Sequence, residues 1–312
     1  MVDKAAEVGA DAVKFQTFTA ERLVSAGAPK ARYQKTSASG RNQLEMLKAL
    51  ELSHQDFAAI SQRARKRGIV FLSTPFDEES VDFLETLDVP AYKVASGDLT
   101  NHSFLEYVAR KGKPMILSTG MSHLEEIREA VAAIRGQGNG NVVLLHCVSS
   151  YPSDPADCNL RAMQTLRDNF NLPVGFSDHT MSVEVAMAAT ALGAVIIEKH
   201  LTLSHKLPGP DQRASLEPKE FQLMVSGIRT TEKAMGSSVK APTESELELR
   251  LVARRSIVAA LEIRKGQVIT KEMVTFKRPG TGIPPNELRI LLGKRAAREI
   301  KRDEVLTWDM IT

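Results

Sequence analysis

Two histidines with matching positions on neighbouring apolar runs are the clearest candidates for chemistry. His179 closes the run 173–180 and His200 closes the run 195–202. The stretch between them, 181–193, is rich in Ala and ends in Gly, as a helix does. A strand–helix–strand order makes the two strands parallel neighbours. We therefore expect both imidazoles at the same carboxyl edge of one sheet, where parallel α/β proteins place metals and substrates.

A single histidine at a strand end is usually a hydrogen-bonded structural residue, whereas two at matching positions favour a metal pair. Two imidazoles completed by carboxylate and water form an open, catalytic type of site. A metal held in this way acts as a Lewis acid on a carbonyl oxygen.

Polar side chains follow the other apolar runs at the same end. Ammonium groups, hydroxyls and backbone N–H groups together can hold a phosphate or a carboxylate. The pattern indicates small anionic substrates, with either metal-assisted carbon–carbon bond formation or phosphate hydrolysis as the reaction. The residues concerned are Lys14, Gln16, Ser73, Thr74, Lys93, Ser96, Asp98, Ser118, Thr119, His146, Ser149, Tyr151 and Ser177.

The elements that must position these residues alternate between short β-rich runs and helical stretches. Helices are expected over 53–67 and 124–136, among others. Seven parallel strands with intervening helices predict an α/β fold, a TIM (β/α)₈-type barrel with one strand missing. A doubly wound open sheet is the alternative, although no Gly-x-Gly-x-x-Gly turn occurs. The runs are 11–18, 69–74, 91–96, 114–119, 142–147 and the two that carry the histidines.

The missing strand is expected to be the first. The run 11–18 is preceded only by residues that read as the last turns of a helix, 4–11. A barrel needs a strand before that helix, and an open barrel would expose two edges. The sequence is therefore interpreted as N-terminally truncated or started too late.

The composition changes after the seventh strand. A polar loop, 206–213, precedes a helix over 217–235 and a stretch rich in Ser, Pro and Thr, 236–246. From residue 254, short runs with Gly and Pro turns predict a compact β-rich module. We expect a barrel domain over 1–238, a linker over 239–252 and the β-rich domain over 253–312.

The bulk properties are those of a globular protein. The 312 residues are 43% hydrophobic and 25% charged, with a net charge of +3. This charge does not indicate a nucleic-acid partner, and no run is long enough for a membrane partner or a signal peptide. Cys147 and Cys158 lack a zinc-like spacing, and a bridge between them is not expected. These features predict a cytoplasmic protein.

Several of these segments resemble the sialic acid (N-acetylneuraminate) synthase family. The resemblance covers essentially the whole chain, including a C-terminal antifreeze-like (SAF, β-clip) domain that residues 254–312 resemble. The segments that carry it are Lys14–Phe18, Ser73–Asp77, Tyr92–Asp98, Leu117–Met121, Leu145–Pro152, Gly175–Thr180, Glu198–Thr202, Gly209–Gln212 and Arg278–Ile283.

The resemblance implies that phosphoenolpyruvate condenses with an N-acetylated hexosamine, such as N-acetylmannosamine, to give N-acetylneuraminate and phosphate. It implies Mn²⁺ or Mg²⁺ on His179 and His200, and no nucleotide cofactor. Phosphoenolpyruvate would be bound by Lys14, Thr74, Lys93, Ser96, Ser118 and Ser177. The sugar would be contacted by Gln16, Asp98, Tyr151 and Asp211. The catalytic set would be Lys14, Gln16, Asp98 and Arg278.

The family pattern also implies an assembly. Arg278 would reach from the SAF domain into the barrel of a partner subunit, which predicts a domain-swapped homodimer. The segments 33–35 and 43–48 resemble the bacterial branch of the family, so legionaminate or pseudaminate synthase is the alternative.

One family segment has no counterpart here. The family's first strand carries a Glu within an Ala-Glu-Ile-Gly-x-Asn-His-Asn-Gly type segment, which this chain lacks. A truncated form with little or no turnover, which only binds carbohydrate, is therefore a second alternative. A metal-dependent phosphohydrolase is the third, and it would be expected to carry more carboxylate ligands.

Overall fold

The computed structural model describes residues 1–31, 34 and 40–312. The bacterial-branch segment 33–35 lies outside these residues except for Gln34. The chain divides into two compact units, Met1–Gly236 and Ser237–Thr312, each with its own hydrophobic core.

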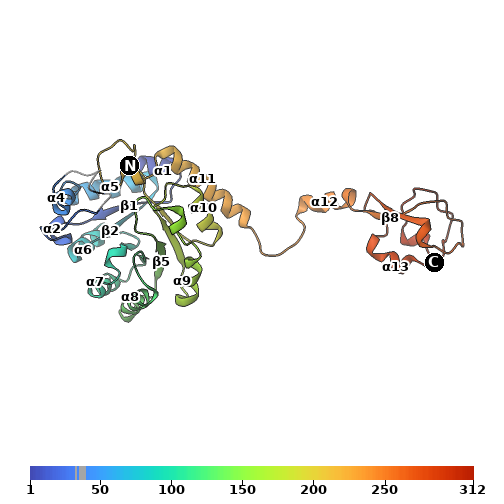
Figure 1. Cartoon of the computed structure of the whole chain (residues 1–312), viewed down its shortest axis with the longest axis horizontal. Coiled ribbons are helices and arrows are strands. Elements are labelled where there is room, and N and C mark those ends of the chain that lie inside the picture. The colour runs from blue at the N-terminus through green and yellow to red at the C-terminus, as the bar shows by residue number, and fades with distance from the viewer. Residues whose placement is uncertain (32–33, 35–39) are drawn as a thin grey trace. The chain divides into compact units, whose positions relative to one another are not determined.

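The first unit is a barrel-like α/β domain in which parallel strands are surrounded by helices (Figure 1). β1 and β2 pair with each other, and β3 to β7 pair in chain order. Its strands among the described residues are β1 (Ala12–Thr17), β2 (Val70–Pro75), β3 (Tyr92–Val94), β4 (Met115–Ser118), β5 (Val142–Cys147), β6 (Val174–Asp178) and β7 (Ile197–Lys199).

Helices follow the strands as the sequence predicts. Ser53 caps α5 through a capping box with Asp56. The described helices of this unit are α1 (Val2–Glu7), α2 (Ala20–Leu23), α4 (Gln43–Lys48), α5 (His54–Arg67), α6 (Glu78–Thr86), α7 (His102–Ala109), α8 (Leu124–Gly136), α9 (Ala162–Phe170), α10 (Glu184–Ala191) and α11 (Pro218–Met235). Short 3₁₀ turns are η1 (Ser96–Asp98), η2 (Pro155–Asp157) and η3 (Gln212–Ala214).

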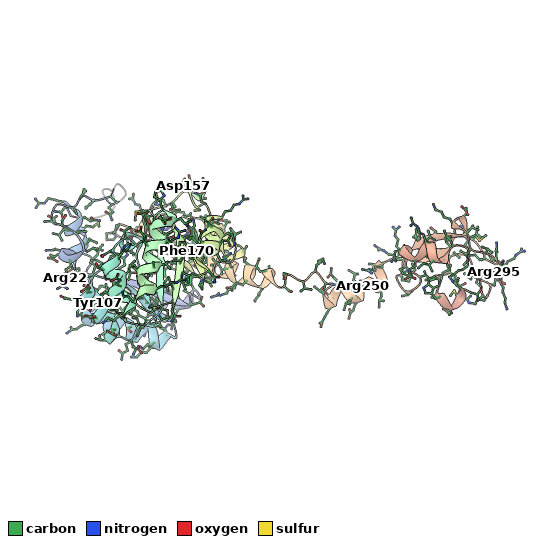
Figure 2. The ribbon with its side chains drawn as sticks, turned by 90° about the horizontal axis from the view of Figure 1, so that it is seen from below. Arg22, Tyr107, Asp157, Phe170, Arg250 and Arg295 are labelled. Atoms are coloured by element: carbon green, nitrogen blue, oxygen red, sulfur yellow. The ribbon has the colours of Figure 1, made fainter. Side chains whose placement is uncertain are left out.

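The core lies between the strands and the helices that cover them. Large side chains such as Tyr92, Met115 and Leu144 on the strands are fully buried against helix residues such as Leu105 and Ile134. Figure 2 labels Phe170, which closes α9 onto the same core, and Tyr107 on α7, whose hydroxyl donates to Asp82. This packing fixes the strands, and with them the polar residues at their carboxyl ends.

The second unit is small and β-rich. β8 (Ser256–Ala259) pairs antiparallel with β9 (Val274–Lys277), and isolated bridges such as Ile263–Ile300 extend the pairing. Its core is built mainly from Ile and Leu side chains. Its other elements are α12 (Glu244–Ala253), α13 (Leu288–Leu291), η4 (Lys271–Met273), η5 (Pro285–Glu287) and η6 (Trp308–Met310).

One element differs from the expectation for residues 239–252. The sequence analysis assigned this stretch to a linker, but Glu244–Ala253 form α12, which carries Arg250 (Figure 2). Thr243 caps it through a capping box with Glu246. None of its side chains is buried, so local capping, rather than an apolar face, defines this helix.

Candidate functional site

Four strands meet around one carboxylate that the sequence analysis did not single out. Glu198 on β7 lies with Oε2 3.6 Å from Lys14 Nζ on β1 and 3.7 Å from Lys93 Nζ on β3. Its Oε1 accepts a hydrogen bond of 2.8 Å from Ser177 on β6. Side chains from these four strands therefore converge on one interior point, as in a barrel.

Lys93 extends this cluster to a fifth strand. Its buried ammonium donates to Ser118 Oγ on β4 at 2.7 Å and to the Val94 carbonyl at 3.0 Å. Burial lowers the pKa of Lys93, and the Glu198 carboxylate opposes this shift. The structure thus brings together four of the residues expected to bind phosphoenolpyruvate: Lys14, Lys93, Ser118 and Ser177.

The electrostatics of Glu198 are set by its two ammonium neighbours. Burial raises its pKa, but Lys14 and Lys93 outweigh burial and hold the pKa well below its ordinary value. The group is a carboxylate held between two cations. The cluster therefore sets two ammonium groups against a single carboxylate.

The two histidines lie beside this cluster with their rings close together. The ring centroids of His179 and His200 are 5.2 Å apart, and Tyr151 lies 4.2 Å from the first ring and 5.7 Å from the second. Asp211 Oδ2 is 3.8 Å from His200 Nδ1. β6 and β7 are parallel neighbours, as the sequence predicts.

The two histidine rings differ in their affinity for protons. His179 Nδ1 lies 2.8 Å from the Val148 carbonyl, which only accepts hydrogen bonds, so Nδ1 carries a proton and Nε2 is the ring nitrogen left for a metal. Burial lowers the pKa of this ring, but Cys147 and the Val148 carbonyl outweigh burial and raise it. Burial, with Lys14 and His179, lowers the pKa of His200 to about 3, so this ring is neutral. In the part of the chain described, no three His, Cys, Asp or Glu side chains form a ligand group. The residues fit a two-histidine site completed by water and substrate oxygens.

Two buried oxygens at strand ends have no hydrogen-bond partner among the described residues. They are Thr74 Oγ1, near the end of β2, and Asp98 Oδ2, in η1. Burial raises the pKa of Asp98 to about 6. Buried polar atoms without partners are uncommon in folded proteins, and a bound ligand would satisfy these two.

Ser96 lies in a crowded turn next to the site. Its Oγ accepts the Gly120 N–H at 3.0 Å. A Cβ on Gly120 would lie 2.3 Å from Ser149 Oγ and 3.2 Å from Cys147 Sγ, so only glycine fits between them. The two cysteines are both free, as expected.

The last two predicted residues lie apart from these contacts. Gln16 is exposed on β1, two residues after Lys14, and its strand partner is Thr74. Arg278 belongs to the second unit, where Ser256 Oγ fixes its loop by donating to the Pro279 carbonyl at 2.7 Å and accepting the Gly282 N–H at 2.9 Å.

Helices are present on all sides of the barrel, but none of them, among the residues that the structure describes, is long and apolar enough to cross a membrane.

Comparison with known proteins agrees with the resemblance read from the sequence. The NeuB family matches residues 1–240 and the SAF domain matches residues 254–312. An N,N'-diacetyllegionaminic acid synthase from Legionella pneumophila is 46% identical, covering 100% of this chain and 89% of that protein. One of the same name from Campylobacter jejuni is 43% identical, covering 98% and 92%. The human N-acetylneuraminate-9-phosphate synthase is 34% identical, covering 100% and 87%.

A solved structure agrees with the fold. The N-acetylneuraminic acid (sialic acid) synthetase from Leptospira borgpetersenii, in complex with citrate, matches with a TM-score of 0.69 and 35% identity over 80% of this chain and 82% of that one. The barrel-like α/β domain and the small β domain are therefore confirmed. The chain belongs to the NeuB family of synthases and carries a C-terminal SAF domain.

Proposed function

We propose that this protein condenses phosphoenolpyruvate with a di-N-acetylated deoxyhexose to form a legionaminic acid, with release of phosphate. The observation that carries the proposal is the pair of ammonium groups, Lys14 and Lys93, around Glu198 at the joint carboxyl edge of the strands. The more similar relatives named above are legionaminic acid synthases, and they favour this sugar over N-acetylmannosamine, which the sequence reading placed first.

The ammonium groups and hydroxyls would bind and orient phosphoenolpyruvate. Lys14 and Lys93 neutralise its anionic groups, while Thr74, Ser96 and Ser118 donate hydrogen bonds to its oxygens. Ser177 donates its proton to Glu198 and would line the same site. Carbon 3 then attacks the aldehyde carbon of the open-chain sugar, and the aldehyde oxygen gains a proton. Water adds to carbon 2, and phosphate leaves by cleavage of the carbon–oxygen bond.

The sugar would lie over the histidines. Tyr151 packs against both rings, and Asp98 and Asp211 offer carboxyl oxygens to hydroxyl or amide groups of the sugar. Gln16 lies on the same face of β1 as Lys14, and Arg278 would act from the SAF domain of a second subunit. His179 and His200 would hold Mn²⁺ or Mg²⁺, which, when bound, polarises the aldehyde oxygen as a Lewis acid.

Phosphate release tests the proposal. The protein is incubated with Mn²⁺ and phosphoenolpyruvate, alone or with each N-acetylated sugar. We expect phosphate only when a sugar is present, with the highest kcat/KM for the di-N-acetylated deoxyhexose. Release without sugar would identify a phosphohydrolase, and sugar binding without release would identify a binding protein.

A further inference from the structure

A second ion pair joins β6 and β7 directly behind the two histidines, and the proposed reaction does not use it. Lys199 Nζ lies 2.7 Å from Asp178 Oδ2, and the two side chains are 1% and 0% exposed. Asp178 and Lys199 are partners in the strand register and immediately precede His179 and His200.

The pair also holds the turn that follows His179. Asp178 Oδ1 accepts the Thr180 N–H at 2.8 Å. Lys199 Nζ donates to the carbonyls of Thr180 and Ser182, the second at 3.3 Å. The ammonium and the carboxylate are therefore bonded both to each other and to the backbone of residues 180–182.

Strand alternation places this pair on the opposite face of the sheet from the site. Ser177 and Glu198 form the contact on the interior face, so the neighbouring residues Asp178 and Lys199 point to the other face. Each strand end is thus bonded on both faces, and the backbone that carries both imidazoles is held between the two contacts.

Stability alone does not explain the pair. A buried ion pair is often no more stabilising than two well-packed apolar residues, because both charges lose their hydration. What an apolar pair cannot supply is the set of directed bonds to Thr180 and Ser182. The pair therefore fixes the geometry of the turn at residues 180–182, and this role is separate from any contribution to the free energy of folding.

We propose that Asp178 and Lys199 are positioning residues that set the relative placement of the His179 and His200 imidazoles. This rests on the proposed function insofar as those imidazoles hold the divalent metal. The backbone bonds of the pair go to Thr180 and Ser182, beyond His179, whereas the lysine–glutamate cluster lies on the interior face. We therefore expect the pair to affect the metal half of the site more than the phosphoenolpyruvate half.

The test compares the 312-residue chain with its double variant Asp178→Leu/Lys199→Met, which replaces the pair by apolar side chains of similar size. Ile134→Ala, a cavity in the core at α8, is the control for general destabilisation. For each protein we measure the Tm, the Kd of Mn²⁺ from the electron paramagnetic resonance of free Mn²⁺, the KM for phosphoenolpyruvate, and the imidazole signals of ¹⁵N-histidine by NMR without metal.

We expect the double variant to bind Mn²⁺ at least tenfold more weakly and to shift the His179 and His200 signals, with the KM for phosphoenolpyruvate within twofold of wild type. The control should lower the Tm without either change. Unchanged histidine signals and an unchanged Kd in the folded double variant would overturn the proposal, as would equal changes in the control. If Mn²⁺ binding to wild type does not depend on His179, the two histidines do not hold the metal and that part of the proposed function is wrong. The histidine NMR signals recorded without metal then still show whether Asp178 and Lys199 position the two imidazoles.

Discussion

Glu198 organises the site at the scale of single residues. Its carboxylate separates two ammonium groups that would otherwise repel each other in a partly buried space. Because the folded protein lowers its pKa, the carboxylate contributes stability that is complete above its ordinary pKa of 4.5 and is lost as the pH falls towards the folded value.

Glu198→Gln removes that charge and leaves Lys14 and Lys93 without a counter-ion. We expect the free energy of unfolding at pH 7.5 to fall by about 3 kcal/mol, since removing one partner of a buried ion pair leaves an uncompensated charge. Urea denaturation measures the change. Glu79→Gln, which removes an exposed partner of Arg22, is the matched control and should lower the free energy of unfolding far less, because solvent screens this pair. Equal losses in the two variants would contradict the assignment.

Asp98 gives the site a pH dependence of its own. Its pKa of about 6 means that the carboxyl becomes protonated as the pH falls from 7 to 5. A protonated carboxyl would be a poorer acceptor for the hydroxyl or amide groups of the proposed sugar. We expect the KM for the sugar to rise below pH 6 in the wild type, and Asp98→Asn to have a high KM at every pH. A KM profile that is flat between pH 5 and 8 in the wild type would count against this role.

The same shift makes a prediction about stability. A carboxyl whose pKa is raised on folding costs no stability below its ordinary pKa of 3.8, and the cost is complete above the folded value of about 6. Two pKa units correspond to about 3 kcal/mol, which is an upper limit for this half-buried group. Asp98→Asn should therefore be more stable than wild type at pH 8 and equal to it at pH 3.5, as measured by urea denaturation at the two pH values.

At the scale of elements, the spacing of β6 and β7 decides where the site residues lie. Gly175 on β6 faces Ile196, just before β7, so closely that an added Cβ would lie 2.4 Å from the Ile196 carbonyl oxygen and 2.6 Å from Leu145 Cδ2. Glycine is required here by the close approach of the backbones. The contact from Ser177 to Glu198 begins two residues further along β6.

Gly175→Ala must push these strands apart. We expect a loss of about 1–3 kcal/mol in unfolding free energy from overpacking, together with weaker Mn²⁺ binding because His179 and His200 move with their strands. Gly136→Ala, at the end of α8 where a Cβ meets no atom, is the matched control and should change stability by no more than about 0.5 kcal/mol. Unfolding curves that coincide for the two variants would refute this account.

The sequence predicts those elements whose signals are local. α8 spans the predicted residues 124–136, and α5 begins after the predicted cap Ser53. α10 is shorter than the predicted 181–193, and α12 was missed because a capping box without an apolar face was read as linker. The sequence predicted Lys14, Lys93, Ser118 and Ser177 as neighbours from their places in the apolar runs, and the structure brings them together. Glu198 was missed because its partners are distant in sequence, although strand alternation places it on the same face as His200.

At the scale of the whole molecule, the chain consists of two units with separate cores. In the second unit, the Gly280 N–H donates to the Leu251 carbonyl at 2.8 Å, so the Arg278 loop is bonded to the end of α12. The proposed domain-swapped dimer requires this loop to serve the barrel of another subunit. This exchange of domains is testable because the barrel and the SAF domain can each be inactivated by a separate substitution.

In the proposed reaction, Lys93→Met should inactivate the barrel and Arg278→Ala should remove the contribution of the SAF domain. A mixed dimer contains one subunit of each variant. If the SAF domains are exchanged, the barrel that keeps Lys93 receives Arg278 from the other subunit, and this one site is complete. Refolding the two inactive variants together should then restore about a quarter of wild-type activity, since half of the dimers are mixed and each has one complete site. No recovery, or an active monomer in sedimentation at dilute concentration, would exclude the exchange.

The rate at which the Cys147 thiol is alkylated can report whether the site is occupied by ligand. Cys147 is 7% exposed, with Sγ 3.9 Å from His179 Nδ1, while Cys158 is 2% exposed and donates to the Asp154 carbonyl. Because Cys147 is buried, an alkylating reagent reaches it only when the strand ends around it open. The labelling rate of Cys147 therefore measures how often this opening occurs. Mass spectrometry of the labelled chain, with Cys158 as the internal reference, should show slower labelling of Cys147 once phosphoenolpyruvate and Mn²⁺ are added. The protein thus carries its own reporter of ligand occupancy, one that needs neither turnover nor an attached dye.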